Sequence, residues 1–230
     1  MGSRWSARVS ELLLESQPAF DQFIAGVQEV PLVAVDTEAA SFHRYNDRIY
    51  LIQVSSRDRT AVIDPLAIPD LSALGALLAN PAVETVFHDA DYDLRILHRD
   101  LGFTATNLFD TRIAAQLLNE PGIGLAALLQ KHFGLTLDKK YQRADWSIRP
   151  LLQGMLEYAA ADTRHLPVLR DIIKRELEEK GRWSWAAEEF ALLERVRWSP
   201  SGPPGEAYLR IKGARTLRGH QYPVLRELYE

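Results

Sequence analysis

Two carboxylates in one short stretch have the spacing to share a metal ion. In VAVDTE, Asp36 and Glu38 are two residues apart, so on a strand both side chains project from the same face of a sheet. Their negative charges repel each other, and a bound Mg²⁺ or Mn²⁺, which prefers oxygen ligands, would remove that repulsion. The alternative for this pair alone is a polar strand end with two solvated acids.

A second acidic stretch follows the expected strand at residues 84–88. In VFHDADYDLRIL, that strand runs into a helix at Asp89, Asp91 and Asp93. Acids at the start of a helix are usually caps or solvated side chains, which is the alternative interpretation here. Strand ends in α/β sheets are also where ligands gather, so one of these aspartates could face the acids of the first stretch.

A third stretch, MLEYAAADTRHL, places Tyr158 and Asp162 four residues apart among alanines. On a helix these two side chains are neighbours, with roughly 5–6 Å between their Cβ atoms, and the alanines permit close approach to a sheet. The alternative is a core helix with Tyr158 half buried and Asp162 paired to Arg164 or Lys174. The three stretches together are more specific than any one, because their order is hard to obtain by accident.

Composition sets broad limits on what these stretches can do. The chain has 230 residues, of which 47% are hydrophobic, which is enough for one large domain with a core. The net charge of -4 gives no global attraction to nucleic acid, so an anionic partner would need a local basic patch or bound metal ions. Without cysteine, any metal site must use oxygen or imidazole ligands. We expect a cytoplasmic protein without a membrane span.

The spacing of apolar residues predicts an α/β fold. Three strands in succession, at 30–41, 48–56 and 59–65, suggest an antiparallel start, and helices and strands then alternate. A loop at 135–150 leads into a long helical stretch, 151–181, which Pro167 should kink. The remaining helices are expected at 16–27, 71–80, 92–102, 111–119 and 124–134, with strands at 84–88 and 107–110.

The composition changes near the C-terminus. SPSGPPG at 199–205 has the character of a linker, so the predicted organisation is a domain at 1–198 and a separate segment at 206–230. The segment has no acidic residue between Glu206 and Glu227, and it is too short to bury a core alone. We interpret it as the truncated start of a small helical nucleic-acid-binding domain.

Across residues 10 to 198, the stretches VAVDTE, HDADYDLRIL, FDTRIAAQLL, RADWSIRPL and EYAAADTRHL resemble the ribonuclease D family. This family belongs to the DEDD superfamily of 3′–5′ exonucleases, in the subgroup with a tyrosine in its last motif. The resemblance implies a ribonuclease-H-like α/β domain with a central mixed sheet flanked by helices. It also implies a catalytic set of Asp36, Glu38, Asp93, Tyr158 and Asp162, and leaves Asp89 and Asp91 with structural roles.

The resemblance further implies two divalent ions, Mg²⁺ or Mn²⁺, held by the four acids of that set. Asp36 should bridge both ions, and Glu38 and Asp162 should complete the site of the ion that activates water. Asp93 should hold the second ion. Two such ions can activate the water and stabilise both the transition state and the leaving oxygen. Because a phenol with a pKa near 10 is a poor base at neutral pH, we expect Tyr158 to orient the water.

Substrate contacts are expected at His88 and in the loop KKYQRADWSIR. The loop combines Lys139, Arg143 and Arg149 with Trp146, a mixture suited to phosphate contacts and base stacking. The alternatives are a satisfied histidine at a strand end and a solvated loop with its tryptophan tucked underneath.

The predicted function is a metal-dependent 3′–5′ exoribonuclease that trims structured RNA such as transfer RNA precursors. Its partner would be the single-stranded 3′ end of RNA, with no obligate protein partner evident. The alternatives are a 3′–5′ DNA exonuclease and a non-catalytic RNA-binding scaffold on the same fold. The intact set of four mutually repelling acids argues against the scaffold.

Overall fold

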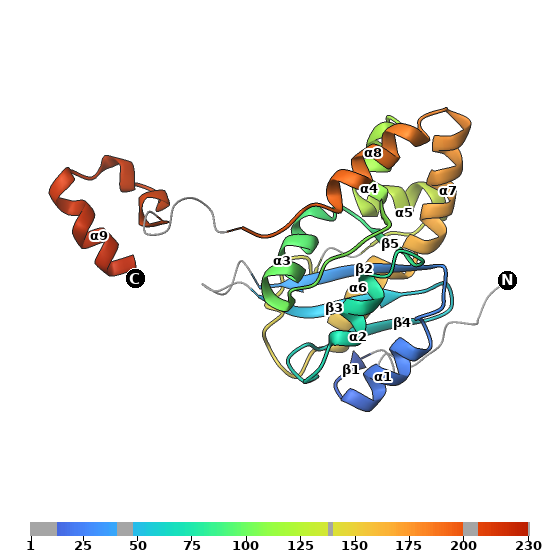
Figure 1. The fold of residues 1–230 in the computed structure, drawn as a ribbon, viewed down its shortest axis with the longest axis horizontal. Coiled ribbons are helices and arrows are strands. Elements are labelled where there is room, and N and C mark those ends of the chain that lie inside the picture. Colours follow the sequence, from blue (N-terminus) through green and yellow to red (C-terminus); the bar gives the residue numbers. More distant parts are fainter. Residues whose placement is uncertain (1–12, 41–47, 138–139, 200–206, 230) are drawn as a thin grey trace. The chain divides into compact units, whose positions relative to one another are not determined.

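In the computed structural model the chain divides into two compact units, Met1–Arg197 and Trp198–Glu230. The structure describes residues 13–40, 48–137, 140–199 and 207–229. In the larger unit the described strands form one six-stranded sheet of order β1-β4-β3-β2-β5-β6 (Figure 1). These strands are β1 (Leu13–Leu14), β2 (Leu32–Ala39), β3 (Ile49–Ser55), β4 (Thr60–Ile63), β5 (Glu84–Phe87) and β6 (Leu108–Asp110).

The sheet is mixed, which confirms the predicted α/β fold. Strands β2, β3 and β4 are antiparallel neighbours, as expected from the three strands in succession. Strands β5 and β6 continue the sheet in parallel with β2. The two-residue strand β1, which pairs in parallel with β4, was not predicted because so short an apolar run carries no periodicity.

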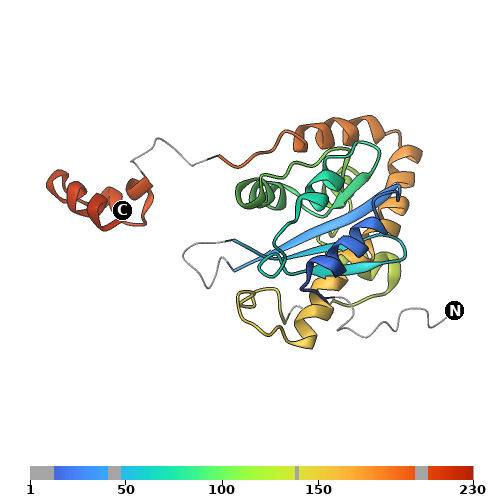
Figure 2. The same ribbon diagram turned by 60° about the horizontal axis from the view of Figure 1, so that its bottom comes forward.

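Helices cover both faces of the sheet (Figure 2). The core on one face joins β2 and β3 to α1, α2 and α3, while the cores on the other face involve α4 to α8. The helices are α1 (Gln17–Ala25), α2 (Ser72–Leu78), α3 (Asp91–Leu101), α4 (Thr111–Leu117), α5 (Leu125–Phe133), α6 (Gln153–Arg164), α7 (Leu166–Glu179) and α8 (Trp183–Leu193).

The chain around Pro167 forms two helices rather than one kinked helix. Helix α6 ends at Arg164 and α7 begins at Leu166, with Pro167 in its first turn. Proline has no N–H to continue the hydrogen-bond ladder of the preceding helix, and its fixed φ suits a helix start. The break lets α6 and α7 run in different directions, so α6 can lie over β2, β3 and β4.

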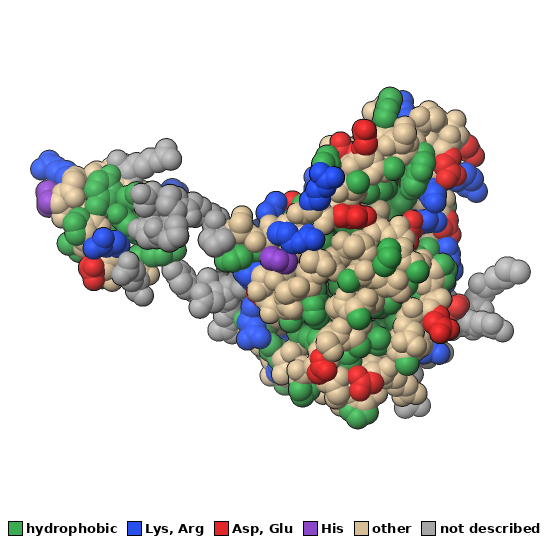
Figure 3. Space-filling view, in the orientation of Figure 1, with side chains coloured by type: hydrophobic (Ala, Val, Ile, Leu, Met, Phe, Trp, Pro, Cys, Tyr) green, Lys and Arg blue, Asp and Glu red, His purple; other side chains and the backbone are tan. Residues whose placement is uncertain are grey.

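Within its described residues, the smaller unit contains 3₁₀ turns and one helix, α9 (Tyr222–Tyr229). Val224 and Leu228, one turn apart on α9, are both exposed. None of the helices in the described part of the chain combines the length and the apolar character that a membrane span needs. On the face of the larger unit drawn in Figure 3, acidic and basic side chains are interspersed.

Candidate active site

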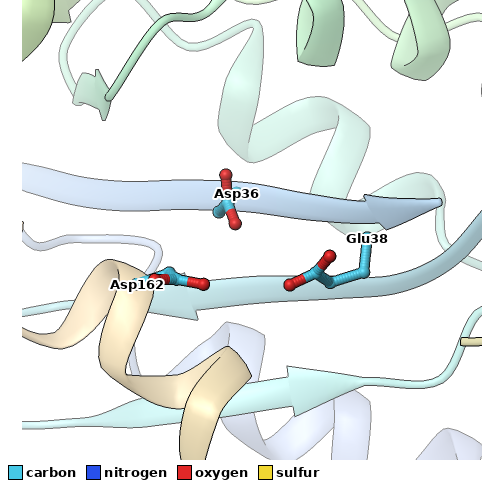
Figure 4. A group of neighbouring side chains, drawn as sticks. All are labelled: Asp36, Glu38 and Asp162. Atoms are coloured by element: carbon cyan, nitrogen blue, oxygen red, sulfur yellow. The ribbon is translucent and has the colours of Figure 1, made fainter. Parts of the chain in front are cut away.

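Three carboxylates meet where α6 crosses the sheet. Asp36 and Glu38 come from β2 and Asp162 comes from α6, and the three offer oxygen atoms that all lie within 4.8 Å of one another. Figure 4 shows the carboxylates of Glu38 and Asp162 directed into the space between strand and helix, with Asp36 beside them. The first and third acidic stretches of the sequence are therefore adjacent in the fold.

Small side chains let the helix approach the strand so closely. Ala159 and Ala160 of α6 are buried against the sheet, in a core cluster that also contains Leu51 of β3. Because residues four apart share a helix face, Tyr158 and Asp162 lie on one edge of this contact. The alternation of side chains along β2 brings Asp36 and Glu38 to the same face. The geometry needed for a shared ion thus follows from two backbone periodicities and two alanines.

The fourth predicted acid, Asp93, reaches the site from the other direction. It lies in the first turn of α3 and is buried, and its Oδ1 accepts a hydrogen bond of 2.5 Å from the hydroxyl of Thr37. Thr37 lies between Asp36 and Glu38 on β2. The charge of Asp93 is near enough to raise the pKa of both neighbouring acids. Asp93 is not one of the three that lie within 4.8 Å of each other.

A buried aspartate that the sequence did not single out holds the start of α3. Asp110 caps α4, where it accepts hydrogen bonds from the backbone N–H groups of Arg112 and Ile113. Its second oxygen accepts from the backbone N–H of Ala90, at 2.7 Å, immediately before α3. Asp110 thereby connects the beginning of α3 to the end of β6, and this connection fixes the position of Asp93 in the first turn of α3. The signal in the sequence was an aspartate followed directly by a helix, the pattern of an N-cap.

The acids of the site resist ionisation together. Burial, reinforced by the charges of the other acids, raises the pKa of Asp36 and of Glu38 well above their usual values. Burial raises the pKa of Asp93 to about 7, although the hydrogen bonds from Thr37 oppose the shift. Burial also raises the pKa of Asp162 to about 7. Among the described residues no lysine or arginine forms an ion pair with any of these four acids.

Asp93 is buried and the other three acids are partly buried, and carboxylates without a cationic side chain beside them are the donor set that a hard divalent cation requires. Mg²⁺ and Mn²⁺ prefer oxygen ligands, and their charge offsets the repulsion that otherwise keeps such a cluster protonated. The alternative partners considered for Asp162 are engaged elsewhere or make no pair with it. The ammonium group of Lys174 lies 4.6 Å from the centre of the Trp183 ring, and Arg164 leaves its Nε without a hydrogen bond.

Tyr158 is held by two aromatic side chains of the preceding loop. Its ring centroid lies 6.1 Å from that of Trp146 and 6.4 Å from that of Tyr141. Tyr141 in turn lies close to α6 because residue 154 is glycine: a Cβ there would lie 2.7 Å from the Tyr141 hydroxyl. Burial and the charges of Asp162, Glu38 and Asp36 raise the pKa of Tyr158, so its hydroxyl stays protonated. The phenol is therefore a fixed hydrogen-bond donor beside the acids.

A cavity of about 350 Å³ opens beside Tyr158 and Asp162. Its other walls combine polar residues with apolar residues from the segment that begins α5. The lining residues are His88, Asp89, Arg112, Ile123, Gly124, Leu125, Ala126, Leu137, Gln142, Tyr158 and Asp162. A half-polar, half-apolar hollow next to carboxylates suits a nucleotide, which has an apolar base face and polar edges.

His88 lines this cavity, and its hydrogen bonds favour one tautomer. The Thr111 hydroxyl donates to the carbonyl oxygen of Phe87 at 3.0 Å, so its oxygen is free to accept from His88 Nδ1, 2.9 Å away. Burial lowers the pKa of His88 and keeps the ring neutral. Because Nδ1 carries the proton in this arrangement, Nε2 is left as a hydrogen-bond acceptor.

Two residues predicted to contact substrate, Trp146 and Arg149, also pack against the rest of the domain. Trp146 is 1% exposed and lies in the core cluster with Leu51 and Leu156, so its ring has no free face on which a base could stack. The Arg149 guanidinium pairs with the buried carboxylate of Asp64 at 2.6 Å, and it also donates to backbone carbonyls. The burial of Trp146 favours the alternative of a tucked tryptophan, and substrate contacts at Trp146 and Arg149 stay a prediction.

The remaining loop predictions are untested by this geometry. Arg143 is exposed, next to Gln142 of the cavity wall. Lys139 falls outside the described residues. Asp91 forms a two-pronged ion pair with Arg95, and Asp89 pairs with Arg112, which agrees with structural roles for both aspartates.

Comparison with known proteins gives matches over most of the chain. The family model described as 3′–5′ exonuclease matches residues 13–178. The chain is 34% identical over 216 residues to ribonuclease D of Shewanella sp. (strain ANA-3), covering 94% of this chain and 55% of that protein. The chain therefore spans about half the length of this curated relative.

Solved structures of nucleases also match this chain over most of its length. The crystal structure of Escherichia coli RNase D, described as an exoribonuclease involved in structured RNA processing, superposes with a TM-score of 0.79 at 32% identity. That match covers 93% of this chain and 57% of the other. Brucella melitensis NrnC with bound Mg²⁺ superposes with a TM-score of 0.66 at 28% identity, over 73% of this chain and 83% of the other. The resemblance and the ribonuclease-H-like fold inferred from the motifs are confirmed.

Proposed function

The chain belongs to the 3′–5′ exonuclease family, and from this premise we propose that it is a metal-dependent 3′–5′ exoribonuclease. The observation that carries the proposal is the convergence of Asp36, Glu38 and Asp162 within 4.8 Å, beside a cavity of nucleotide size. The substrate we propose is the single-stranded 3′ end of a structured RNA, such as a transfer RNA precursor. The lack of cysteine agrees with action in the reducing cytoplasm.

We propose that Asp36, Glu38, Asp93 and Asp162 hold two divalent ions, Mg²⁺ or Mn²⁺. Such ions, when bound, supply acidification of a water and stabilisation of negative charge on the phosphate and the leaving oxygen. The chemistry of the donor set and the shared elevation of the pKa values of these acids support this assignment. The related NrnC structure with bound Mg²⁺ also supports a magnesium requirement.

Within this proposal, Tyr158 donates a hydrogen bond that orients the attacking water. The raised pKa of its phenol makes it a poor proton acceptor, which supports orientation over general-base catalysis. The water oxygen forms the new bond to phosphorus while the bond from phosphorus to the 3′-oxygen breaks. His88 would accept a hydrogen bond at Nε2 from a hydroxyl of the terminal nucleotide, and Arg143 and Lys139 would contact phosphates beyond it.

The proposal is tested by digestion of matched RNA and DNA strands, each with a free or a blocked 3′ end, in Mn²⁺ and in EDTA. We expect stepwise shortening of the free-ended RNA in Mn²⁺ and no cleavage in EDTA. Equal rates on RNA and DNA would remove the ribonuclease assignment, and cleavage of the blocked strand would remove the exonuclease assignment. If Asp93→Ala cleaved RNA at the wild-type rate in Mn²⁺, the assigned site would be wrong.

A further inference from the structure

A buried glutamine with no hydrogen bond lies beside the acid cluster. Gln53 of β3 is 0% exposed, and in the described part of the chain neither its Nε2 nor its Oε1 has a partner. A buried amide without partners is destabilising, because it has lost its hydrogen bonds to water and gained none in return. An apolar side chain of the same size would suit this core better, so the amide requires an explanation.

The sheet register directs this amide toward Asp36. Gln53 lies directly opposite Asp36 in the antiparallel pair of β2 and β3, and directly opposite Val62 on the other side. Opposite residues project from the same face, with Cβ atoms roughly 4.5–5.5 Å apart. Of these two flanking side chains, only Asp36 can form a hydrogen bond.

Helix α6 closes this face over Gln53. Along β3, Leu51 packs in the cluster that contains Ala159 and Ala160, and the Ser55 hydroxyl bonds Thr163 of α6 at 2.7 Å. Gln53 lies between Leu51 and Ser55 on the same face. Its amide is therefore enclosed by the two elements that carry Asp36 and Asp162, where water does not reach it.

We propose that Gln53 is a positioning residue whose amide N–H donates to the Asp36 carboxylate when that carboxylate holds a metal ion. The inference rests on the proposed function, because it assigns Asp36 to metal binding. Hydrogen bonds to a ligating carboxylate fix its orientation, and their loss typically lowers metal affinity or activity roughly 10–100-fold. The Gln53 amide, which has no other partner among the described residues, is then the donor of such a bond to Asp36.

The test replaces Gln53 with methionine, which has similar length and no amide, in the full chain. The matched control is Thr85→Val on β5, because Thr85 is also 0% exposed with an unpaired Oγ1 and makes no part of the site. Mn²⁺ binding is measured by calorimetry without RNA, thermal unfolding is measured in EDTA, and RNA digestion is measured against Mn²⁺ concentration.

We expect both substitutions to raise the unfolding temperature in EDTA. Only Gln53→Met should weaken Mn²⁺ binding, by about 10–100-fold, and raise the Mn²⁺ concentration needed for half-maximal digestion. If Gln53→Met does not fold by circular dichroism, Gln53→Leu replaces it. Wild-type Mn²⁺ affinity in the folded variant would overturn the role of Gln53 while the nuclease assignment stands. A wild-type protein that neither binds Mn²⁺ nor cleaves RNA would instead overturn the proposed function.

Discussion

The Thr37 hydroxyl donates to Asp93 Oδ1 at 2.5 Å and so joins the strand that carries two site acids to the helix that carries a third. Thr37 separates Asp36 from Glu38 in the sequence, and its side chain takes the opposite direction from theirs on β2. The bond stabilises the ionised form of Asp93, and it opposes the effect of burial on the pKa of that carboxyl. Thr37 therefore bears on the protonation of Asp93 as well as on its position.

The first prediction concerns this bond. Thr37→Val keeps the shape of the side chain and removes the donor, so the pKa of Asp93 should rise further above about 7. Because metal binding needs the ionised carboxylate, the acidic limb of the pH–rate profile should move to higher pH. The measurement is the rate of RNA digestion as a function of pH, from about pH 5.5 to about pH 9. Thr37→Ser, which keeps a hydroxyl, is the control, and an unchanged acidic limb in Thr37→Val would contradict the assigned role.

The second prediction concerns pH and the metal-free protein. Asp93 and Asp162 have pKa values of about 7 in the folded state, against the ordinary value of 3.8 expected after unfolding. The folded protein therefore binds more protons than the unfolded chain between these values, and its stability should fall as pH rises through this window. Added Mn²⁺ should reverse the loss, since it binds the ionised acids of the folded state.

The measurement for this prediction is the unfolding temperature in EDTA and in Mn²⁺ across the same pH window. Asp36→Asn is the informative variant, because it removes one charge from the cluster at nearly constant shape. It should unfold at a higher temperature than the wild type in EDTA at pH 8 and should lose nuclease activity by more than about 100-fold. A metal-free wild type that became more stable from pH 5 to pH 8 would show that these acids are not clustered as described.

The third prediction separates the tyrosine from the metal ligands. Tyr158→Phe keeps the ring that packs on Trp146 and Tyr141 and removes the hydroxyl beside the acids. Digestion should slow by roughly 10²-fold, a loss that misplacing a reacting group can cause. Calorimetric Mn²⁺ affinity should stay within about threefold of the wild type. A large loss of Mn²⁺ affinity in Tyr158→Phe would make Tyr158 part of the metal site instead.

Local sequence patterns predicted the parts of this site that depend on backbone periodicity. The D-x-E spacing required both carboxylates on one strand face, and the Y-x-x-x-D spacing required one helix edge, whatever the rest of the fold. The three successive strands also predicted the antiparallel pairing that places Gln53 beside Asp36. The partner of Thr37, 56 residues away, follows only from tertiary packing, so no local pattern could indicate it.

The loop before α6 shows the limit of composition as evidence. Trp146 and Arg149 occur among basic and aromatic residues, a composition that suits both nucleic-acid contact and a packed loop. A packed loop differs from a nucleic-acid contact in that its basic side chains find acceptors within the protein. Asp64, which directly follows β4, provides such a buried acceptor for Arg149. The burial of Trp146 likewise depends on its packing with Leu51 of β3 and Leu156 of α6, which belong to distant or separate elements that local composition does not indicate.

The last prediction tests whether Trp146 supports the core or contacts RNA. Trp146 is among the largest fully buried side chains, and its ring supports Tyr158. Trp146→Ala should lower the free energy of unfolding by about 3–5 kcal/mol, the usual cost of removing a large aromatic side chain from a core. Trp146→Phe should recover part of this loss and of the activity, because it refills the space beside Tyr158. The free energy of unfolding is measured in urea for both variants. RNA affinity is measured for both in a protein that also carries Asp36→Asn, so that the RNA is not digested during the measurement. A tryptophan that stacked on a base would show the opposite result, with stability unchanged and RNA affinity lost.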